Sequence, residues 1–271
     1  MIQALINIIK TNIKHRDQMW EMAKNHQKKQ YRGSDMVLLW AFAKPVMYIF
    51  VFFFAISIGF KSSTNVEGII TPYFVWLSIG LISFFYMRDM ILNGANSLKK
   101  YGVLVARTKF PMEILPTSVA TSYMFIHLGM LAIGIVLALL FRTPPSIYWL
   151  QIPFYMLLMY IMAIFWSLAT GIISVIYRDF YNFLQVANQA VFWLSAILFD
   201  VNRLGPRGQT AFLFNPITYI VEGYRNAICR HVWFWEEPVK LGCFLLMLFV
   251  MIFVALLMYR KLRKRLPDVI V

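Results

Sequence analysis

Charged residues are scarce in this 271-residue chain, and acidic ones are the scarcest. Asp, Glu, Lys and Arg together make up 14% of the sequence, and only 12 residues are acidic against 26 that are basic. A soluble globular protein carries roughly 25% charged residues. Because 60% of this chain is apolar, the composition excludes a soluble domain and a disordered tail. It predicts an integral membrane protein.

Several chemical motifs are also missing. The two cysteines, Cys229 and Cys243, have no accompanying histidine pattern, so neither a zinc site nor a disulfide framework is predicted. No Gly-x-x-x-x-Gly-Lys-Ser/Thr sequence occurs, so the phosphate-binding loop of ATPases is absent. No Ser/His/Asp set or intramembrane carboxylate pair is visible either. We therefore expect no metal or cofactor on this chain, and any energy for work must come from a partner.

Six apolar stretches are long enough to cross a bilayer, which requires about 20 residues each. They are residues 37–58, 69–87, 114–141, 147–177, 180–199 and 241–259. Lys44 is the only formal charge within them, and beside Pro45 it suits a headgroup anchor. His127 is the only candidate for proton coupling, and a histidine without a carboxylate partner is a poor relay. The sequence predicts an all-α membrane protein with six transmembrane helices.

The basic residues indicate how the chain is oriented. With both termini in the cytoplasm, 18 of the 26 basic residues face the cytoplasm, while Arg225 and Arg230 are among the seven assigned to the outer face. Positive charge accumulates on the cytoplasmic side of membrane proteins. This orientation explains the net charge of +14 better than a nucleic-acid partner does.

Three segments outside the apolar stretches have their own patterns. Residues 1–36 form an expected cytoplasmic interfacial arm, because apolar residues recur there at helical spacing without the apolar core of a signal peptide. Residues 200–238 contain two short apolar pieces on either side of Asn215-Pro216, which favours re-entrant or interfacial helices. Residues 260–271 form a basic cytoplasmic tail.

Four groups of short motifs fall in register with the six stretches over nearly the whole chain. They are Tyr31-Arg32-Gly33-Ser34 with Leu39-Trp40 and Pro45, Lys109-Phe110-Pro111 with Glu113 and Leu115-Pro116, Tyr177-Arg178-Asp179, and Asn215-Pro216. With these motifs the chain resembles the permease subunits of bacterial ABC-2 exporters for cell-surface polysaccharides. Those proteins export O-antigen, capsule or wall teichoic acid.

The resemblance implies an ABC-2 transmembrane domain over residues 37–259 that forms a homodimer in a bacterial cytoplasmic membrane. Two copies of a separate ATPase subunit would bind ATP and Mg²⁺, so the chain itself would not be an enzyme. The substrate would be a polyprenyl-linked polysaccharide or teichoic acid. A coupling helix is expected at residues 99–109, although a solvated loop is the simpler interpretation of that segment. The expected ATPase-coupling residues are Lys99, Lys100, Tyr101, Arg107, Lys109, Phe110, Pro111, Glu113, Arg178 and Asp179.

The fifth apolar stretch carries amides at mostly three- and four-residue steps, and these are candidates for a substrate path. Amides in a bilayer are costly unless partnered or wetted, so they either line a pore or hold helices together. Neighbouring aromatic residues offer surfaces for stacking sugar rings. The path candidates are Asn182, Gln185, Asn188 and Gln189, with Phe50, Phe52, Phe53, Phe54, Phe192 and Trp193.

Two alternatives stay open. A small-molecule or drug exporter of the same superfamily would have a closed apolar pocket instead of a polar groove. An integral-membrane enzyme that handles lipid-linked sugars without ATP would need an acidic pair or a metal-binding acid motif at the end of a span, and neither is visible.

Overall fold

The computed structural model describes residues 1–30, 37–55, 72–102, 104, 110–177 and 179–262. Within these ranges every regular element is a helix. Four of the described helices are long and apolar enough to cross a membrane. They are Tyr73–Gly94, Ile114–Leu140, Ile147–Ile176 and Pro238–Lys261. The predicted all-α membrane protein is therefore confirmed at this level.

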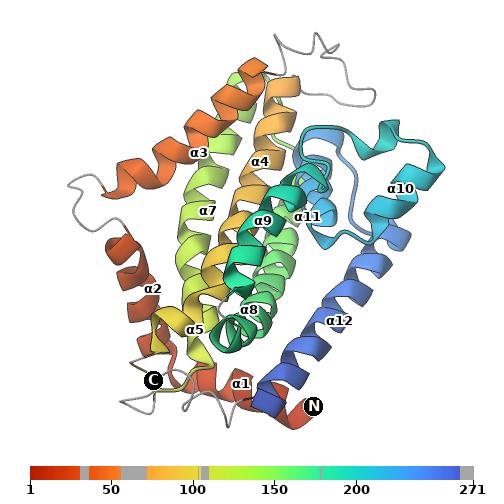
Figure 1. Ribbon diagram of the computed structural model, residues 1–271. Coiled ribbons are helices and arrows are strands. Elements are labelled where there is room, and N and C mark those ends of the chain that lie inside the picture. The colour runs from red at the N-terminus through yellow and green to blue at the C-terminus, as the bar shows by residue number, and fades with distance from the viewer. Residues whose placement is uncertain (31–36, 56–71, 103, 105–109, 178, 263–271) are drawn as a thin grey trace.

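Helix α4 (Tyr73–Asp89) lies at the centre of the bundle (Figure 1). Its residues from Phe74 to Met87 are all buried, so it is enclosed on every side. It continues into a π-helical turn, η2 (Met90–Gly94), and thus extends seven residues beyond the predicted end of the second span at residue 87.

The other long helices surround α4 or pack on its neighbours. Helix α7 (Ile114–Leu140) contacts α4 directly, and α8 (Ile152–Ile176) packs against η2. A 3-10 turn, η3 (Ile147–Gln151), leads into α8. Helix α12 (Pro238–Leu262) runs along α8 at the edge of the bundle.

Two other helices fall within stretches that were predicted to span the membrane. Helix α3 (Val37–Phe54) crosses α4 and α7 at a steep tilt (Figure 1); residues 56–58 of that prediction lie outside the described residues. Helix α9 (Phe180–Trp193) ends six residues before the predicted residue 199. Fourteen residues extend only about 21 Å, less than the roughly 30 Å hydrocarbon core. The prediction that this helix spans to residue 199 is therefore wrong.

The segment after α9 contains one surface helix and one interior helix. Helix α10 (Pro206–Leu213) has no buried residue. Helix α11 (Pro216–Arg225) has nine, Ile217–Arg225, and it continues into the π-helical η5 (Asn226–Arg230). It packs among α4, α8 and α12. The predicted break at Asn215-Pro216 is confirmed, because Asn215 Oδ1 accepts the backbone N–H groups of Ile217 at 3.0 Å and Thr218 at 3.3 Å.

The first 30 residues form two helices that meet at His15. Helix α1 (Ile2–Lys14) lies across one end of the bundle, near the end of α12 (Figure 1). It buries Ala4 and Ile8, while its other apolar side chains, Ile2, Ile6, Ile9 and Ile13, stay exposed. Helix α2 (Arg16–Gln30) packs along α7. The exposed isoleucines of α1 suit the expected interfacial role, whereas α2 is a packed helix of the bundle.

A second apolar cluster holds this end of the molecule together. It joins Ile8 of α1, Leu98 of the short helix α5 (Ser97–Lys100), Leu115 of α7, Leu168 of α8 and Leu256 of α12. We call it the α1-end cluster. It connects α5 with α1 and with the bases of α7, α8 and α12.

Candidate functional site

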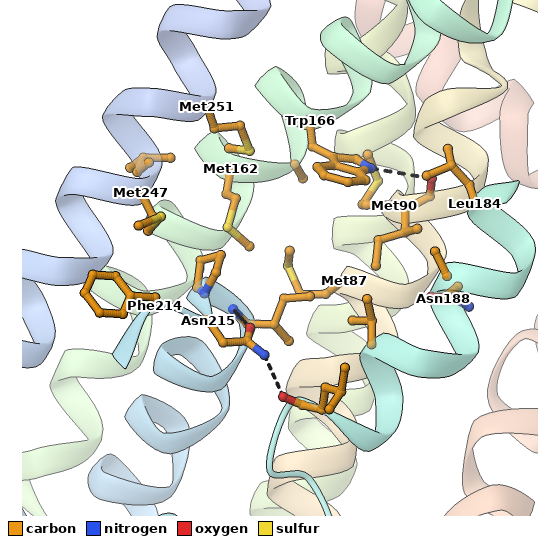
Figure 2. Close-up of a pocket in the computed structure, with 18 of the residues that line it drawn as sticks. Met87, Met90, Met162, Trp166, Leu184, Asn188, Phe214, Asn215, Met247 and Met251 are labelled. Atoms are coloured by element: carbon orange, nitrogen blue, oxygen red, sulfur yellow. Dashed lines mark hydrogen bonds between the residues drawn. The ribbon is translucent and has the colours of Figure 1, made fainter. Parts of the chain in front are cut away.

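A cavity of about 590 Å³ lies between η2, α8, α9, α11 and α12 (Figure 2). Its wall is almost entirely apolar. Trp166 and Phe214 contribute aromatic surface. Five of the lining side chains are methionines: Met87, Met90, Met162, Met247 and Met251. Methionine side chains are flexible and polarisable, so they adapt to irregular apolar shapes. The site can therefore hold a flexible apolar group.

Two asparagines bring polar atoms to this cavity. Asn215 Nδ2 donates to the Leu194 carbonyl at 2.7 Å and to Ser195 Oγ at 3.2 Å. Asn188 Oδ1 is buried and has no hydrogen-bond partner among the described residues. An unsatisfied buried acceptor costs about 1–3 kcal/mol. A water molecule or a ligand donor in the cavity would remove that cost.

The remaining predicted amides of α9 lie elsewhere. Asn182, Gln185 and Gln189 are exposed, and their spacing places them on one stripe of the helix. We call these three residues the α9 amide stripe. The structure thus separates Asn188, at the cavity, from the α9 amide stripe, and the substrate-path role of both stays a prediction.

The predicted aromatic residues also separate into two groups. Phe192 contacts Phe52 of α3 and Phe84 of α4, with ring centroids 5.1 and 5.4 Å apart. Phe53 packs edge-on against Phe74 at 4.6 Å. These rings hold α3, α4 and α9 together. The other three predicted residues, Phe50, Phe54 and Trp193, are more than half exposed.

The turn that follows α9 is held by a side chain of α11. Arg225 Nη1 donates to the Ala196 carbonyl at 2.9 Å, and Nη2 donates to the Ile197 carbonyl at 2.5 Å. Ala196 has a φ of 52°. Both residues are fully buried, and buried carbonyls need hydrogen-bond partners. Arg225 supplies these partners three and four residues beyond the last residue of α9.

The Arg225 guanidinium is fully buried. It lies 2.8 Å from Glu222 Oε1, and its Cζ is 3.4 Å from the centroid of the Trp76 ring. Gly80 makes room for it, because a Cβ atom there would lie 2.3 Å from Arg225 Nη2. A lone buried cation would be costly, so the Glu222 carboxylate and the carbonyl acceptors are needed to hold it there.

Arg230 extends this network. It forms ion pairs with Glu222 at 2.5 Å and with Asp200 at 2.6 Å. We call Asp200, Glu222, Arg225 and Arg230 the buried ionic network. This network was not predicted, because the distribution of basic residues places both arginines in an outer loop. The available signal was Glu222-x-x-Arg225, a charge pair at helical spacing next to an apolar run.

Part of the expected ATPase-coupling segment can be described. Lys99 and Lys100 are exposed at the end of α5, and Asp179 is exposed at the start of α9. Phe110 and Pro111 are half-buried, and Phe110 packs against the α1-end cluster. Arg107, Lys109 and Arg178 lie outside the described residues, as does most of the predicted coupling helix.

Tyr101 connects this segment to the N-terminal arm. Its hydroxyl lies 3.0 Å from Nδ1 of the buried His26, whose ring also packs against Tyr123. Burial raises the pKa of Tyr101. His26 could not be selected from the sequence, because a single histidine in a polar helix carries no motif.

Glu113 is buried and not on the surface. Its carboxylate accepts a hydrogen bond from the Tyr259 hydroxyl, and its backbone carbonyl accepts one from Asn12 Nδ2 at 3.3 Å. In this arrangement the side chain has no surface with which to contact a docked subunit. It joins α1, the start of α7 and the end of α12.

Replacing Tyr259 with phenylalanine should lower the free energy of unfolding by about 1–3 kcal/mol, because the buried Glu113 carboxylate loses a donor. The measurement is the thermal unfolding midpoint in detergent. Tyr177→Phe is the matched control, since Tyr177 is 66% exposed, and its midpoint should not change. Equal midpoints for both variants would contradict a supporting role for the Glu113–Tyr259 bond.

The described residues contain no group of three or more His, Cys, Asp or Glu side chains that could hold a metal ion. Neither cysteine forms a disulfide, and Cys229 is buried.

Comparison with known proteins gives a consistent result. The chain is 20% identical over 231 residues to an O-antigen export system permease protein RfbA from Myxococcus xanthus, covering 84% of this chain and 86% of that protein. It is 20% identical over 244 residues to a protein of the same name from Klebsiella pneumoniae, covering 90% and 91%. Residues 17–229 match the family described as ABC-2 type transporter. Since this match covers well over half of the chain, the protein belongs to the ABC-2 type transporter family.

Proposed function

We propose that this chain is the transmembrane subunit of an ATP-driven exporter. It moves a polyprenyl-linked surface polysaccharide of the O-antigen type from the inner to the outer face of the bacterial cytoplasmic membrane. The names of the relatives support this class of cargo; teichoic acid and capsule share its chemistry. The chain itself is non-catalytic, and a separate ATPase subunit binds ATP and Mg²⁺.

The observation that carries this proposal is the exposure of the α9 amide stripe. Asn182, Gln185 and Gln189 face outward from a helix that packs beside η2 and α8. Amides are costly against lipid, so another surface must cover them or water must reach them. A second copy of the chain would place two such stripes opposite each other. A homodimer therefore provides a polar path for sugars. In this arrangement each subunit has six membrane-embedded helices, and α10 and α11 lie toward the outer face of the membrane.

The α1 end of the bundle is the proposed docking side for two ATPase subunits. Lys99 and Lys100 are exposed there, and Leu98 of the same short helix is fully buried in the α1-end cluster. Movement of a docked subunit would reach α7, α8 and α12 through this cluster. Both termini and the segment at residues 99–109 then lie in the cytoplasm, in agreement with the distribution of basic residues.

We expect Gln185→Leu combined with Gln189→Leu to abolish polymer export while leaving the complex assembled, because the path loses polar groups that sugars need. The measurement is surface polymer in cells, together with co-purification of the ATPase subunit. Gln18→Leu, an exposed amide on α2, is the control and should export normally.

Normal export by the Gln185/Gln189 variant would contradict the polar path. Purification of a homo-oligomer without any ATPase subunit, in a detergent known to preserve such complexes, would contradict the exporter itself.

One observation favours a second function, the export of small apolar molecules. The methionine-lined cavity has the volume and the apolar wall that such cargo needs. Depleting the chain distinguishes the two functions. Loss of surface polymer with unchanged drug susceptibility supports the first, and the reverse result supports the second.

A further inference from the structure

The methionine-lined cavity of about 590 Å³ lies between two helices that pack mainly on other elements. Helix α12 packs along α8 and α11, whereas α9 packs on η2, α4 and α8. Figure 2 shows Met247 and Met251 of α12 on one side of the cavity, and Leu184 and Asn188 of α9 on the other. A molecule bound in the cavity would therefore contact both helices at once.

No charged side chain lines this cavity among the described residues. Its wall consists of apolar side chains, Trp166 and the two asparagines. An ionised group would lose its hydration there without gaining an opposite charge, which is costly. The cavity therefore does not suit the phosphate of the proposed cargo or the headgroup of an anionic phospholipid. It favours a neutral ligand.

The polar side chains of the wall differ in whether their hydrogen-bonding atoms are engaged. Asn215 uses both ends of its amide, because Nδ2 donates to the Leu194 carbonyl and Oδ1 accepts from the backbone of α11. Trp166 Nε1 donates to the Ile91 carbonyl at 3.5 Å. Asn188 Oδ1, in contrast, is buried without a hydrogen-bond partner among the described residues. A carbonyl oxygen can only accept, so its ligand must carry a hydroxyl or N–H donor.

The rest of the wall suits a hydrocarbon chain. Methionine side chains adjust to the shape of a flexible apolar partner, and they lie on η2, α8 and α12. The cavity volume of about 590 Å³ lies within the roughly 300–1,000 Å³ that is typical of sites for drug-sized ligands. One hydrocarbon chain therefore fits it better than a two-chain phospholipid does.

We propose that this cavity binds a neutral single-chain lipid, a hydrocarbon chain that ends in a hydroxyl group. The hydroxyl donates to Asn188 Oδ1, and the chain lies against Met162, Met247 and Met251. Bound in this way, the lipid joins α9 to α12. It is a bound component of the membrane domain, and its binding does not depend on which cargo the protein exports.

The test compares 1-hexadecanol with hexadecyl methyl ether, which has the same chain and an oxygen atom but no donor. Binding of each probe to the purified full-length protein is measured in one detergent. We expect the alcohol to bind about three- to tenfold more tightly, the effect of one hydrogen bond. It should also raise the thermal unfolding midpoint more than the ether does at equal concentration. Hexadecyl phosphate, the charged probe, should bind more weakly than the alcohol.

Three variants locate the binding. Asn188→Leu keeps the size of the side chain and removes the acceptor, so the alcohol and the ether should bind equally. Ala187→Phe places a ring in the cavity and should weaken the binding of both probes. Asn25→Leu, an exposed asparagine of α2, is the matched control and should keep the full preference for the alcohol.

Equal binding of the alcohol and the ether by the unmodified protein would overturn the proposal, and this comparison requires no variant to fold. Tighter binding of hexadecyl phosphate than of the alcohol would overturn it too, because the cavity would then select an anion. So would a full preference for the alcohol in a folded Asn188→Leu variant, or unchanged binding of both probes in a folded Ala187→Phe variant. None of these measurements depends on whether the protein exports a polymer.

Discussion

Replacing Arg225 with methionine should lower the free energy of unfolding by about 3–5 kcal/mol, the cost of breaking a buried ion pair by removing one partner. The Ala196 and Ile197 carbonyls would lose their donors, and Glu222 would lose one of its two cations. Methionine fills similar space, so the loss reports the charge and the hydrogen bonds. The measurement is the thermal unfolding midpoint in detergent, monitored by tryptophan fluorescence.

Arg207→Met is the control for this experiment, because Arg207 is an exposed arginine of α10. Its unfolding midpoint should match that of the unmodified protein. Arg225→Lys should fall between the two, since lysine keeps the charge without the fork of donors. A midpoint for Arg225→Met as high as that of Arg207→Met would show that the buried ionic network does not stabilise the bundle.

Gly223→Ala is the second substitution with a large expected effect. A Cβ atom at residue 223 would lie 2.2 Å from Cε1 of the Tyr155 ring and 2.5 Å from two further ring atoms. Tyr155 is only 1% exposed, and the rings of Tyr219 and Tyr224 lie nearby. The ring has no free space to enter, so α11 must move away from α8. Overpacking of this kind costs about 1–3 kcal/mol.

The same glycine-to-alanine change in α12 provides the control. A Cβ atom at Gly242 would have no neighbour within 4 Å. Gly242→Ala should therefore leave stability unchanged or raise it by up to about 1 kcal/mol, because alanine favours the helix. If both alanine variants unfold at the same midpoint, the close contact between α11 and α8 is not needed for stability.

The long helices were predictable because their lengths and apolar composition are local properties of the sequence. Helices α7 and α8 begin and end within a few residues of their predicted limits. The turn after α9 was not predictable, because its carbonyls are bound by Asn215 and Arg225, which lie 20 or more residues further along the chain. Apolar residues continue past Trp193, so hydropathy alone extends that helix.

The candidate sites follow the same principle. The amides of α9 could be recognised from the sequence, but only packing separates Asn188, which lines the methionine-rich cavity, from the exposed Gln185 and Gln189. Lys44 was expected to be a headgroup anchor, and His127 was expected to be a poor proton relay. Their convergence on one cavity with Arg88 requires the tilt of α3 across α4 and α7.

Asn215 uses one side-chain amide to satisfy two helix ends. Its oxygen accepts from the first turn of α11, and its nitrogen donates to the Leu194 carbonyl just past the end of α9. Pulling these helices apart would expose both ends at once in a region poor in water. We therefore expect α9 and α11 to move as one rigid body. A tilt of α9 at its base would then move α11 by the same rotation.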